Sequence, residues 1–276
     1  MTDNRMREIR RKADSFREKC KISRYGLIDL FEDCKRLGYK VIRYPLGETS
    51  YLGFVLRKDQ DIVIFTSTSS RLSRELFTLA HEIGHAVLHM DEESSFLDNS
   101  TTISEKTEGE KESDANYFAA CLLMPAEEVD RFLDLELSNV SENGFSALDI
   151  ARIMSEFHVS FDMVLNRLEN LQKINIYERL RLDNEKNEKR VGNLLKSVGG
   201  NSCLNDPSEV IDIPYEYLDY VIFNYNHNAI PKETLERALT YYKLCTEDIS
   251  DKLVEHPDDE DDNDDNIEDL LGELED

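Results

Sequence analysis

Residues 70–90, SRLSRELFTLAHEIGHAVLHM, decide the fold because they join a helical apolar repeat to a chemical motif. The apolar residues recur at helical spacing, at Leu72, Leu76, Leu79, Ile83, Val87 and Met90. Serine residues at the start of the segment can cap a first helical turn. We therefore predict a helix from about residue 70 to residue 90, with His81 and His85 near its middle.

The middle of this helix has the pattern H-E-x-x-H, formed by His81, Glu82 and His85. Residues four apart on a helix project from one face, about one turn apart, so both imidazoles can reach one ion. A catalytic zinc ion takes three protein ligands and keeps a position for water, whose pKa falls to about 7 when bound. Glu82 is placed to accept the proton of that water. The pattern thus predicts metal-assisted hydrolysis.

A third ligand is expected from the next predicted helix, residues 111–124, which contains Glu112, Asp114 and Asn116 near its start. Asp114 is the nearest competitor of Glu112, but two residues further along a helix it points to a different side. His89 extends the i+4 series, yet three histidines over two helical turns cannot all converge on one ion. We favour Glu112 as the ligand, and for His89 a packing role or a contact to a ligand.

Two segments resemble the ImmA/IrrE-type metallo-endopeptidases, a gluzincin-like family of zinc peptidases. They are RELFTLAHEIGHAVLH (74–89) and ESDANYFAACLLMP (112–125), and they occur in the expected order. A weaker likeness extends over the first helices and over residues 144–171, so that the resemblance covers about residues 6–171.

The resemblance implies that His81, His85 and Glu112 bind Zn²⁺ and that Glu82 activates water. Asn116 matches a position where related gluzincins often carry an aspartate that orients a zinc-bound histidine. An asparagine would hold the imidazole through its carbonyl oxygen and add no charge. The implied activity is site-specific cleavage of an internal peptide bond in a regulatory protein. The expected substrate is a helix-turn-helix repressor that controls a stress response or a mobile element.

Two other function classes remain open at this stage. One is a non-catalytic protein-binding regulator on the same scaffold, like a partner in a toxin–antitoxin pair. The other is a DNA-binding factor, because residues 146–168 (SALDIARIMSEFHVSFDMVLNRL) superficially resemble a helix-turn-helix. The second helix of this segment offers Asn166 and Arg167 but little basic charge, so we favour packing over DNA contacts.

The predicted fold is α+β and zincin-like, predominantly helical, with a small three-stranded, mainly antiparallel sheet. The strands are expected in residues 39–46, 51–57 and 61–67, which are rich in β-branched and aromatic side chains. We take residues 61–67 (DIVIFTS) as the edge strand along which an extended peptide substrate would lie. The polar residues 91–110 are expected to form an exposed, mobile excursion.

Three regions are predicted along the chain. Residues 1–173 form the metallopeptidase domain, and residues 174–256 form a C-terminal helical region with helices at 175–197, 214–224 and 232–253. Residues 257–276 form a disordered acidic tail, because residues 258–276 hold twelve acids and no base.

Composition narrows the function classes further. The formal net charge of −25 disfavours direct nucleic-acid binding. No apolar run is long enough to cross a bilayer and the first residues lack a signal-peptide core, so a cytoplasmic protein without membrane contact is expected. The five cysteines are scattered and show no C-x-x-C spacing, which indicates neither a disulfide framework nor a thiolate metal site. The oligomeric state stays open.

Overall fold

The computed structural model describes residues 1–47, 51–58, 60–90, 95–99, 109–138 and 144–254. The chain divides into two compact units, Met1–Ile213 and Pro214–Asp276. The predicted boundary at residue 173 lies inside the first unit, because the helices that follow it pack against the helices before it. The acidic tail predicted for residues 257–276 lies outside the described residues.

The first unit contains a four-stranded sheet in the order β1-β3-β2-β4. The strands are β1 (Lys40–Tyr44), β2 (Tyr51–Lys58), β3 (Asp61–Ser67) and β4 (Ser95–Asn99). β1 pairs with β3 in parallel, whereas the β2–β3 and β2–β4 pairings are antiparallel. The three predicted strands are confirmed, and the sheet is mixed.

Two predictions about the sheet are wrong. Residues 61–67 form a central strand and not an edge strand, because β3 pairs with β1 on one side and with β2 on the other. The segment 91–110, predicted as an exposed excursion, contributes the edge strand β4 through its residues 95–99. Polar composition concealed this strand, which is held by main-chain pairing to β2. Residues 91–94 and 100–108 lie outside the described residues.

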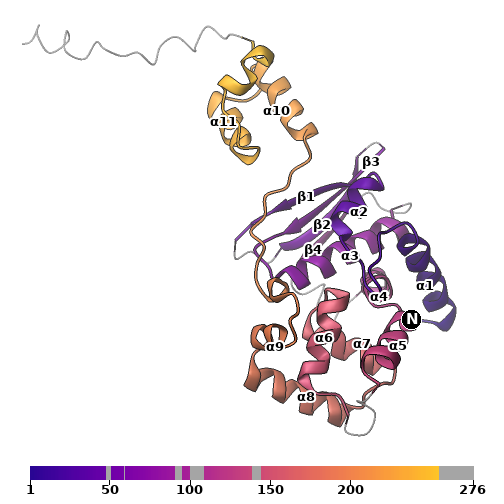
Figure 1. Cartoon of the computed structure of the whole chain (residues 1–276). Helices are drawn as coiled ribbons and strands as arrows, with labels where there is room; N and C mark the ends of the chain where they lie inside the picture. Colours follow the sequence, from indigo (N-terminus) through magenta and orange to yellow (C-terminus); the bar gives the residue numbers. More distant parts are fainter. Residues whose placement is uncertain (48–50, 59, 91–94, 100–108, 139–143, 255–276) are drawn as a thin grey trace, which may run out of the picture. The chain divides into compact units, whose positions relative to one another are not determined.

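Helix α3 (Leu72–Leu88) is the predicted motif helix, and it packs against strands β2 and β3 (Figure 1). Its apolar side, including Leu79 and Ile83, is fully buried. Gly53 of β2 permits the close approach of helix and strand. A Cβ at this position would lie 2.4 Å from Thr78 Cγ2 and 3.0 Å from Glu82 Oε1. Gly53 therefore fits where a larger residue would collide with the helix.

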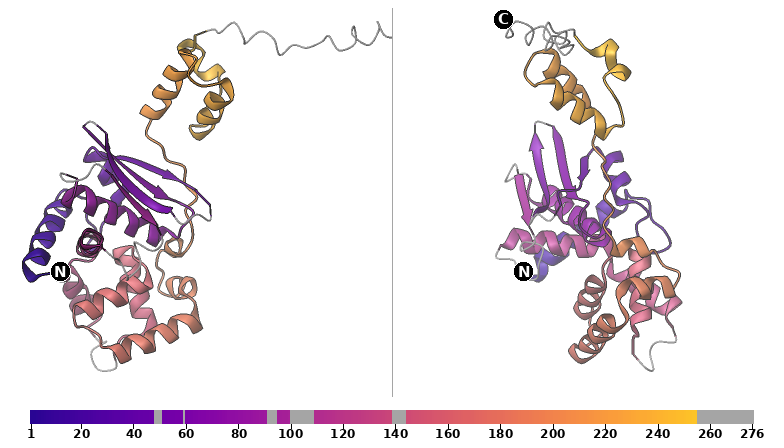
Figure 2. Two further views of the ribbon diagram at one scale, coloured as in Figure 1. Left: turned by 180° about the vertical axis from the view of Figure 1, so that it is seen from behind. Right: turned by 90° about the vertical axis from the view of Figure 1, so that its left-hand side faces the viewer.

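Helix α4 (Glu110–Leu123) runs beside α3 and also packs against α1 (Asp3–Arg17) (Figures 1 and 2). Helix α2 (Leu30–Arg36) contacts β1, and α5 (Ala126–Glu136) follows α4 after Pro125. The second predicted helical motif, residues 111–124, is thus confirmed as a helix. Its placement brings the two sequence motifs together.

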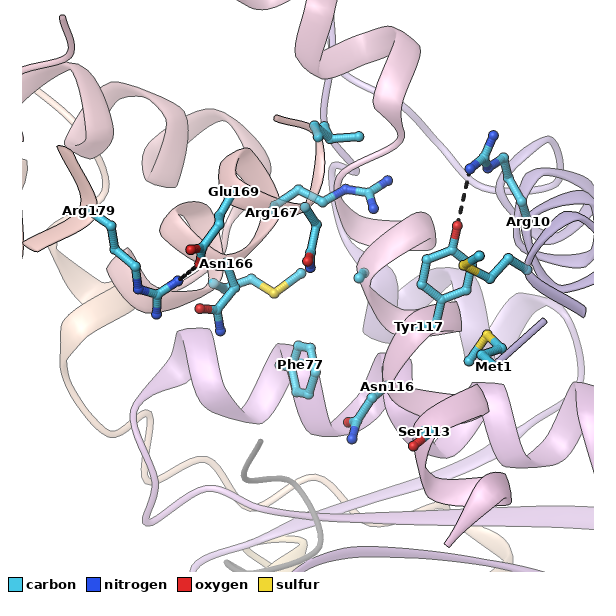
Figure 3. A pocket seen from close by; sticks show the side chains of 15 residues that line it. Met1, Arg10, Phe77, Ser113, Asn116, Tyr117, Asn166, Arg167, Glu169 and Arg179 are labelled. Carbon is cyan, nitrogen blue, oxygen red and sulfur yellow. Dashed lines mark hydrogen bonds and ion pairs between the residues drawn. The ribbon is translucent and has the colours of Figure 1, made fainter. Parts of the chain in front are cut away.

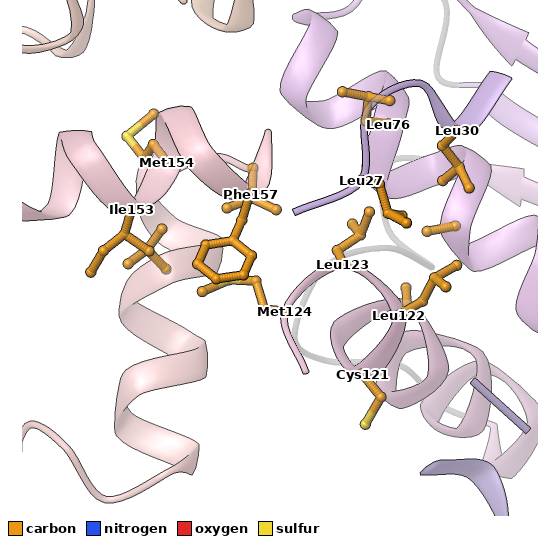
Figure 4. Packing of buried hydrophobic residues seen from close by; sticks show 14 of the residues in the cluster. Leu27, Leu30, Leu76, Cys121, Leu122, Leu123, Met124, Ile153, Met154 and Phe157 are labelled. Carbon is orange, nitrogen blue, oxygen red and sulfur yellow. The ribbon is translucent and has the colours of Figure 1, made fainter. Parts of the chain in front are cut away.

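The remaining helices of the first unit are α6 (Ala147–Phe157), α7 (Phe161–Asn170), α8 (Ile176–Lys189) and α9 (Val191–Ser197). Their core is continuous with that of α3 and α4: Met124 lies close to Phe157 on one side, while Leu122 and Leu123 face Leu27 and Leu30 on the other (Figure 4). The continuous core explains why the first compact unit extends beyond residue 173. The single helix predicted at 175–197 is in fact two helices, separated at Arg190, whose φ is +61°.

A short segment after α9 returns to the sheet. It contains the 3₁₀ helix η2 (Ser202–Asn205) and then forms an isolated bridge between Asp212 and Arg43 of β1. This segment therefore belongs to the first unit.

The second unit contains α10 (Glu216–Asn226), α11 (Lys232–Tyr241) and the 3₁₀ helix η3 (Glu247–Lys252). Its small core is separate from that of the first unit and includes Leu218, Leu235 and Leu239. The helix predicted at 232–253 is broken near Lys243, where φ is +58°. Within the described residues, no helix of either unit combines the length and the hydropathy that crossing a bilayer requires.

A buried ion pair joins the sheet to α3. Arg43 of β1 donates from Nε to Glu75 Oε1 at 2.7 Å and from a terminal nitrogen to Oε2 at 3.0 Å. Glu75 is fully buried, and it also accepts hydrogen bonds from Thr66 at 3.1 Å and from Ser208 at 3.0 Å. This network fixes the start of α3 against the sheet and against the segment after η2.

We predict that Arg43→Met lowers the free energy of unfolding by about 3–5 kcal/mol, because it leaves the Glu75 carboxylate buried without its cation. The shift of the urea unfolding midpoint, followed by far-UV circular dichroism, measures this loss. Arg57→Met, at an exposed position of β2, is the control and should change the midpoint little. An Arg43→Met variant as stable as the parent chain would contradict the assigned role.

Candidate metal centre

Two histidines of α3 and one glutamate of α4 converge on a point between the helices. His81 Nε2 lies 3.0 Å from His85 Nε2. Glu112 Oε2 lies 3.2 Å from His81 Nε2, and its Oε1 lies 3.3 Å from His85 Nε2. Both histidines are fully buried, whereas the Glu112 side chain is 20% exposed. The predicted ligand set His81, His85 and Glu112 is thus brought together in space.

The spacing of these donor atoms fits a tetrahedral metal ion. Bonds of about 2.0–2.1 Å between zinc and its nitrogen or oxygen ligands place the corners of a tetrahedron about 3.3 Å apart. The separations of 3.0, 3.2 and 3.3 Å lie close to this value, the last two being to different oxygens of the Glu112 carboxylate. Two imidazole nitrogens and one carboxylate oxygen are also a donor set that zinc accepts in catalytic sites. The residues therefore fit a divalent ion with one open position.

Asn116 of α4 holds the ring of His81 from the side away from the donor atom. His81 Nδ1 lies 2.9 Å from Asn116 Oδ1. Because an amide oxygen only accepts hydrogen bonds, Nδ1 carries the proton and donates it. The lone pair of the neutral imidazole then lies on Nε2, where the other two donors converge. This contact therefore favours the tautomer whose Nε2 could bind a metal ion.

His85 is held in a comparable way by His89, one turn further along α3. Their Nδ1 atoms lie 3.1 Å apart, while His89 Nε2 lies 3.7 Å from Asp114 Oδ2. Asp114 is in turn bound by Arg5 of α1, with its oxygen 2.6 Å from a terminal nitrogen of the guanidinium. His89 and Asp114, weighed above as alternative ligands, therefore lie behind the donor atoms and support His85.

The site keeps its carboxylate charged and its supporting histidine neutral. Burial alone would raise the pKa of Glu112, but hydrogen bonds and charge from the protonated forms of His81 and His85 outweigh it and hold the pKa below its ordinary value. Burial, together with the neighbouring His85, lowers the pKa of His89 to about 4. With both ligand imidazoles neutral, as metal binding requires, the donor set would have a single negative charge, on Glu112.

Close contact between α3 and α4 places Glu112 within reach of the histidines. A Cβ on Gly84 would lie 3.1 Å from Ala115 Cα and 3.3 Å from Ala115 Cβ. Gly84 is one of the two unspecified residues of the H-E-x-x-H pattern, and Ala115 lies three positions after Glu112. The small side chains at this crossing therefore determine how near the carboxylate comes.

Glu82, the predicted general base, is fully buried on α3 between the two histidines in sequence. Its Oε1 atom faces the backbone of β2 at Gly53, as the short distance to a virtual Cβ there shows. Strand β2 lies between β3 and the edge strand β4. The pairing register of β2 with β4 shifts between Tyr51 and Gly53. The carboxylate thus lies close to an irregular part of the sheet beside its edge.

A cavity of about 840 Å³ is lined by Asn116, the residue that contacts the His81 ring (Figure 3). We call it the α1/α4/α7 cavity, after the helices that contribute most of its lining. Ser113 and Phe77 line it beside Asn116. The Phe77 ring lies 6.5 Å from the ring of His81, measured between centroids.

Sequence reasoning identified the residues that converge and missed those that shape their surroundings. Gly53 and Gly84 carry no side chain that could signal a function. Their role, which is to allow close packing of α3 against β2 and against α4, is visible only in the structure. Of the residues lining the cavity, Arg167 and Asn166 were considered only as part of a helix-turn-helix. The i+4 spacing of His89 was the one sequence signal for the support of His85, and there it was read as packing or a ligand contact.

Comparison with known protein families supports this geometry. Residues 34–169 match the family model Peptidase_M78, described as the IrrE N-terminal-like domain. The match includes α3 and α4 with all the convergent residues, and it confirms the resemblance carried by the two sequence motifs. Residues 6–33, where the likeness was weak, lie outside it. No curated protein matches the chain. The family indicates an enzyme of the metallopeptidase type.

We predict that Asn116→Ala weakens zinc binding about tenfold to a hundredfold, the usual cost of removing a group that orients a metal ligand. Competition with a chromophoric chelator measures the affinity. Asn116→Asp keeps an acceptor oxygen and adds a charge, so it should retain or strengthen binding. If the alanine variant binds zinc as tightly as the parent chain, the hydrogen bond to His81 does not set the tautomer.

We also predict that Gly84→Val loses most of the bound metal although every donor residue is retained. A branched side chain must push α4 away from α3, because the atoms it meets belong largely to the Ala115 backbone. Metal content per chain after dialysis, together with a circular dichroism spectrum to confirm folding, tests this. Gly84→Ala is the graded control, since it requires a shift of only a few tenths of an ångström. Full metal content in folded Gly84→Val would show that the helices need not approach so closely.

Proposed function

We propose that this chain, whose residues 34–169 form an IrrE N-terminal-like domain of the Peptidase_M78 family, is a zinc-dependent endopeptidase with a zincin-like catalytic fold. The observation that supports zinc is the near-tetrahedral spacing of the His81, His85 and Glu112 donor atoms. The proposed target is an internal peptide bond of a regulatory protein.

Each residue of the centre then has a defined task. A zinc ion bound there would polarise a peptide carbonyl and lower the pKa of a water molecule. Glu82 accepts the proton of the attacking water and transfers it to the leaving amine. Asn116 and His89 keep His81 and His85 in the tautomers whose Nε2 lone pairs face the ion. The arrangement supports hydrolysis without a covalent intermediate on the protein.

The sheet offers a place for the substrate backbone. Strand β4 is the edge of the sheet next to β2, whereas the opposite edge strand, β1, is bridged at Arg43 by Asp212. An extended peptide can add to an exposed edge through main-chain hydrogen bonds, which require no particular side chains. We propose that β4 takes the role expected from the sequence for residues 61–67. Glu82 approaches the sheet at Gly53 of β2, the strand that pairs with β4.

We propose a helix-turn-helix repressor as the physiological substrate, with cleavage relieving repression of stress-response or mobile-element genes. The support is the family resemblance together with charge. The chain has a formal net charge of −25, which would steer a basic DNA-binding protein toward it at low ionic strength.

The DNA-binding alternative loses support from the burial of Arg167. This arginine, one of the two α7 residues considered for DNA contacts, is only 4% exposed and donates from Nε to the carbonyl of Met124 at 2.8 Å. A phosphate of a DNA duplex would have to reach this buried side chain from the protein surface. Packing of α6 and α7 within the first unit is the simpler role.

We predict that Glu82→Gln lowers the rate of peptide cleavage by about 10²–10⁴ fold, because an amide cannot accept the proton. Metal content should remain, since Glu82 is not part of the donor set. The measurement is cleavage of a helix-turn-helix regulator encoded beside the gene, coexpressed with the parent chain or with the variant. Removal of zinc by a chelator should abolish cleavage, and added zinc should restore it.

The same variant separates the protease from a binding regulator. A regulator that acts by binding alone would keep its biological effect with Glu82→Gln, whereas a protease would lose it. Glu127→Gln, an exposed first-turn residue of α5, is a matched control that should change neither metal content nor cleavage. Unchanged derepression by metal-loaded Glu82→Gln would exclude proteolysis as the mechanism.

A further inference from the structure

The α1/α4/α7 cavity has a charge opposite to that of the whole protein. Its lining includes three arginines, Arg10, Arg167 and Arg179, and one acid, Glu169. Glu169 is paired with Arg179 at 2.7 Å. Two guanidinium groups are therefore in excess in this cavity, while the chain as a whole has a formal net charge of −25. A positively charged cavity in a strongly acidic protein suggests that the cavity binds an anionic group.

Of the two arginines in excess, Arg10 and Arg167, Arg167 is the more buried. A guanidinium keeps its charge at all accessible pH values, and a buried charge is costly unless it is paired. Arg167 is 4% exposed, yet no carboxylate of the described residues forms an ion pair with it. Its Nε donates to the Met124 carbonyl at 2.8 Å, and a terminal nitrogen lies 4.0 Å from Cys121 Sγ. By contrast, buried Arg17 donates to two carbonyl oxygens, those of Leu122 and Tyr25.

Arg10 supplies the second cation from the opposite wall (Figure 3). One terminal nitrogen donates to the hydroxyl of Tyr117 at 3.1 Å, and in the described part of the chain no carboxylate pairs with it. Tyr117 thereby directs the guanidinium toward the cavity wall formed by α4. Guanidinium groups bind carboxylates with two parallel hydrogen bonds, which is the strongest pairing they make with a peptide side chain.

The rest of the lining suits a peptide. Asn166 lines the cavity as well, and a side-chain amide can bond to a peptide backbone. Met6, Met163 and Phe77 provide an apolar surface for the methylene groups of a side chain. A volume of about 840 Å³ accommodates a side chain together with part of its backbone.

We propose that the α1/α4/α7 cavity is a substrate subsite for an acidic side chain of the peptide to be cleaved. Asn116 and Phe77 line it and also lie against the His81 ring, so an occupant would be close to the metal centre. The carboxylate is bound by Arg10 and Arg167, and the Asn166 amide lies beside it on the cavity wall. This inference rests on the proposed peptidase function and adds to it a specificity that the fold alone does not give.

Binding of two peptide pools tests the subsite without any cleavage. The pools are fluorescein-labelled heptapeptides with equimolar mixtures at six positions and either Glu or Gln at the central one. The protein is the full chain with zinc added and with Glu82→Gln, so that peptides stay intact. We expect the Glu pool to bind about tenfold more tightly in fluorescence polarisation, as hydrogen bonds between charged groups allow.

The arginines are then removed one at a time. Arg10→Gln should abolish the preference for Glu over Gln. Arg7→Gln is the matched control: Arg7 lies on the same helix, is exposed and does not line the cavity, so the preference should remain. Arg167→Lys keeps the charge but loses the two-pronged geometry, and it should reduce the preference. Equal binding of both pools, or a preference unchanged in folded Arg10→Gln, would overturn the proposal.

A cleavage experiment separates this proposal from the proposed function. The zinc-loaded parent chain is incubated with a proteome-derived peptide mixture, and the cut sites are identified by mass spectrometry. Acidic residues should be enriched at one fixed position from the scissile bond, and Arg10→Gln should remove that enrichment. Cleavage without acid enrichment overturns the subsite and leaves the peptidase standing. Absence of cleavage with Arg10-dependent binding of the Glu pool overturns the peptidase and leaves the binding site.

Discussion

The close crossing of α3 and α4 is the constraint on which the metal centre depends. The histidines lie on one helix, and their mutual spacing follows from a single turn of that helix. The carboxylate comes from another helix, and its position depends on how near the two axes approach. Gly84 and Ala115 meet where a Cβ would already be crowded, at 3.1 Å from the neighbouring Cα. The ion pair of Arg43 with Glu75 holds the start of α3 against the sheet, and so it fixes the same helix from its other side.

Local sequence patterns predicted the features that depend on residues close together in the sequence, such as helices and the side chains that share one face of a helix. The pattern around His81 and His85 predicted a helix with both imidazoles on one face, and the structure has both. Glu112 was found because its own segment is a recognisable motif. The position of residues 61–67 was missed because strand order depends on the parallel pairing of β3 with β1, which no local pattern encodes. The breaks at Arg190 and Lys243 were missed because neither residue type signals a positive φ.

The α1/α4/α7 cavity illustrates what a sequence alone cannot supply. Arg10 and Arg167 are more than 150 residues apart, and each looks unremarkable beside its neighbours in the chain. Arg167 attracted attention only as part of a segment resembling a helix-turn-helix. Its meaning changes once it is buried next to a carbonyl, with no acid of the described residues paired with it. The excess of positive charge is a property of three helices together, and it is hidden in a composition that is strongly acidic overall.

The two orienting contacts of the metal centre are both neutral, and this bears on its chemistry. An amide oxygen orients His81, and a histidine whose pKa is lowered to about 4 supports His85. Negative charge in the donor set therefore comes from Glu112 alone, and a divalent ion held there would keep one net positive charge. An aspartate beside His81 would reduce that excess and make the imidazole a stronger donor. A divalent ion would therefore be held less tightly beside an asparagine than beside an aspartate. The acidic residues elsewhere in the protein lie far from the ion, and salt screens their charges over such distances. They therefore do not cancel the positive charge at the metal centre itself.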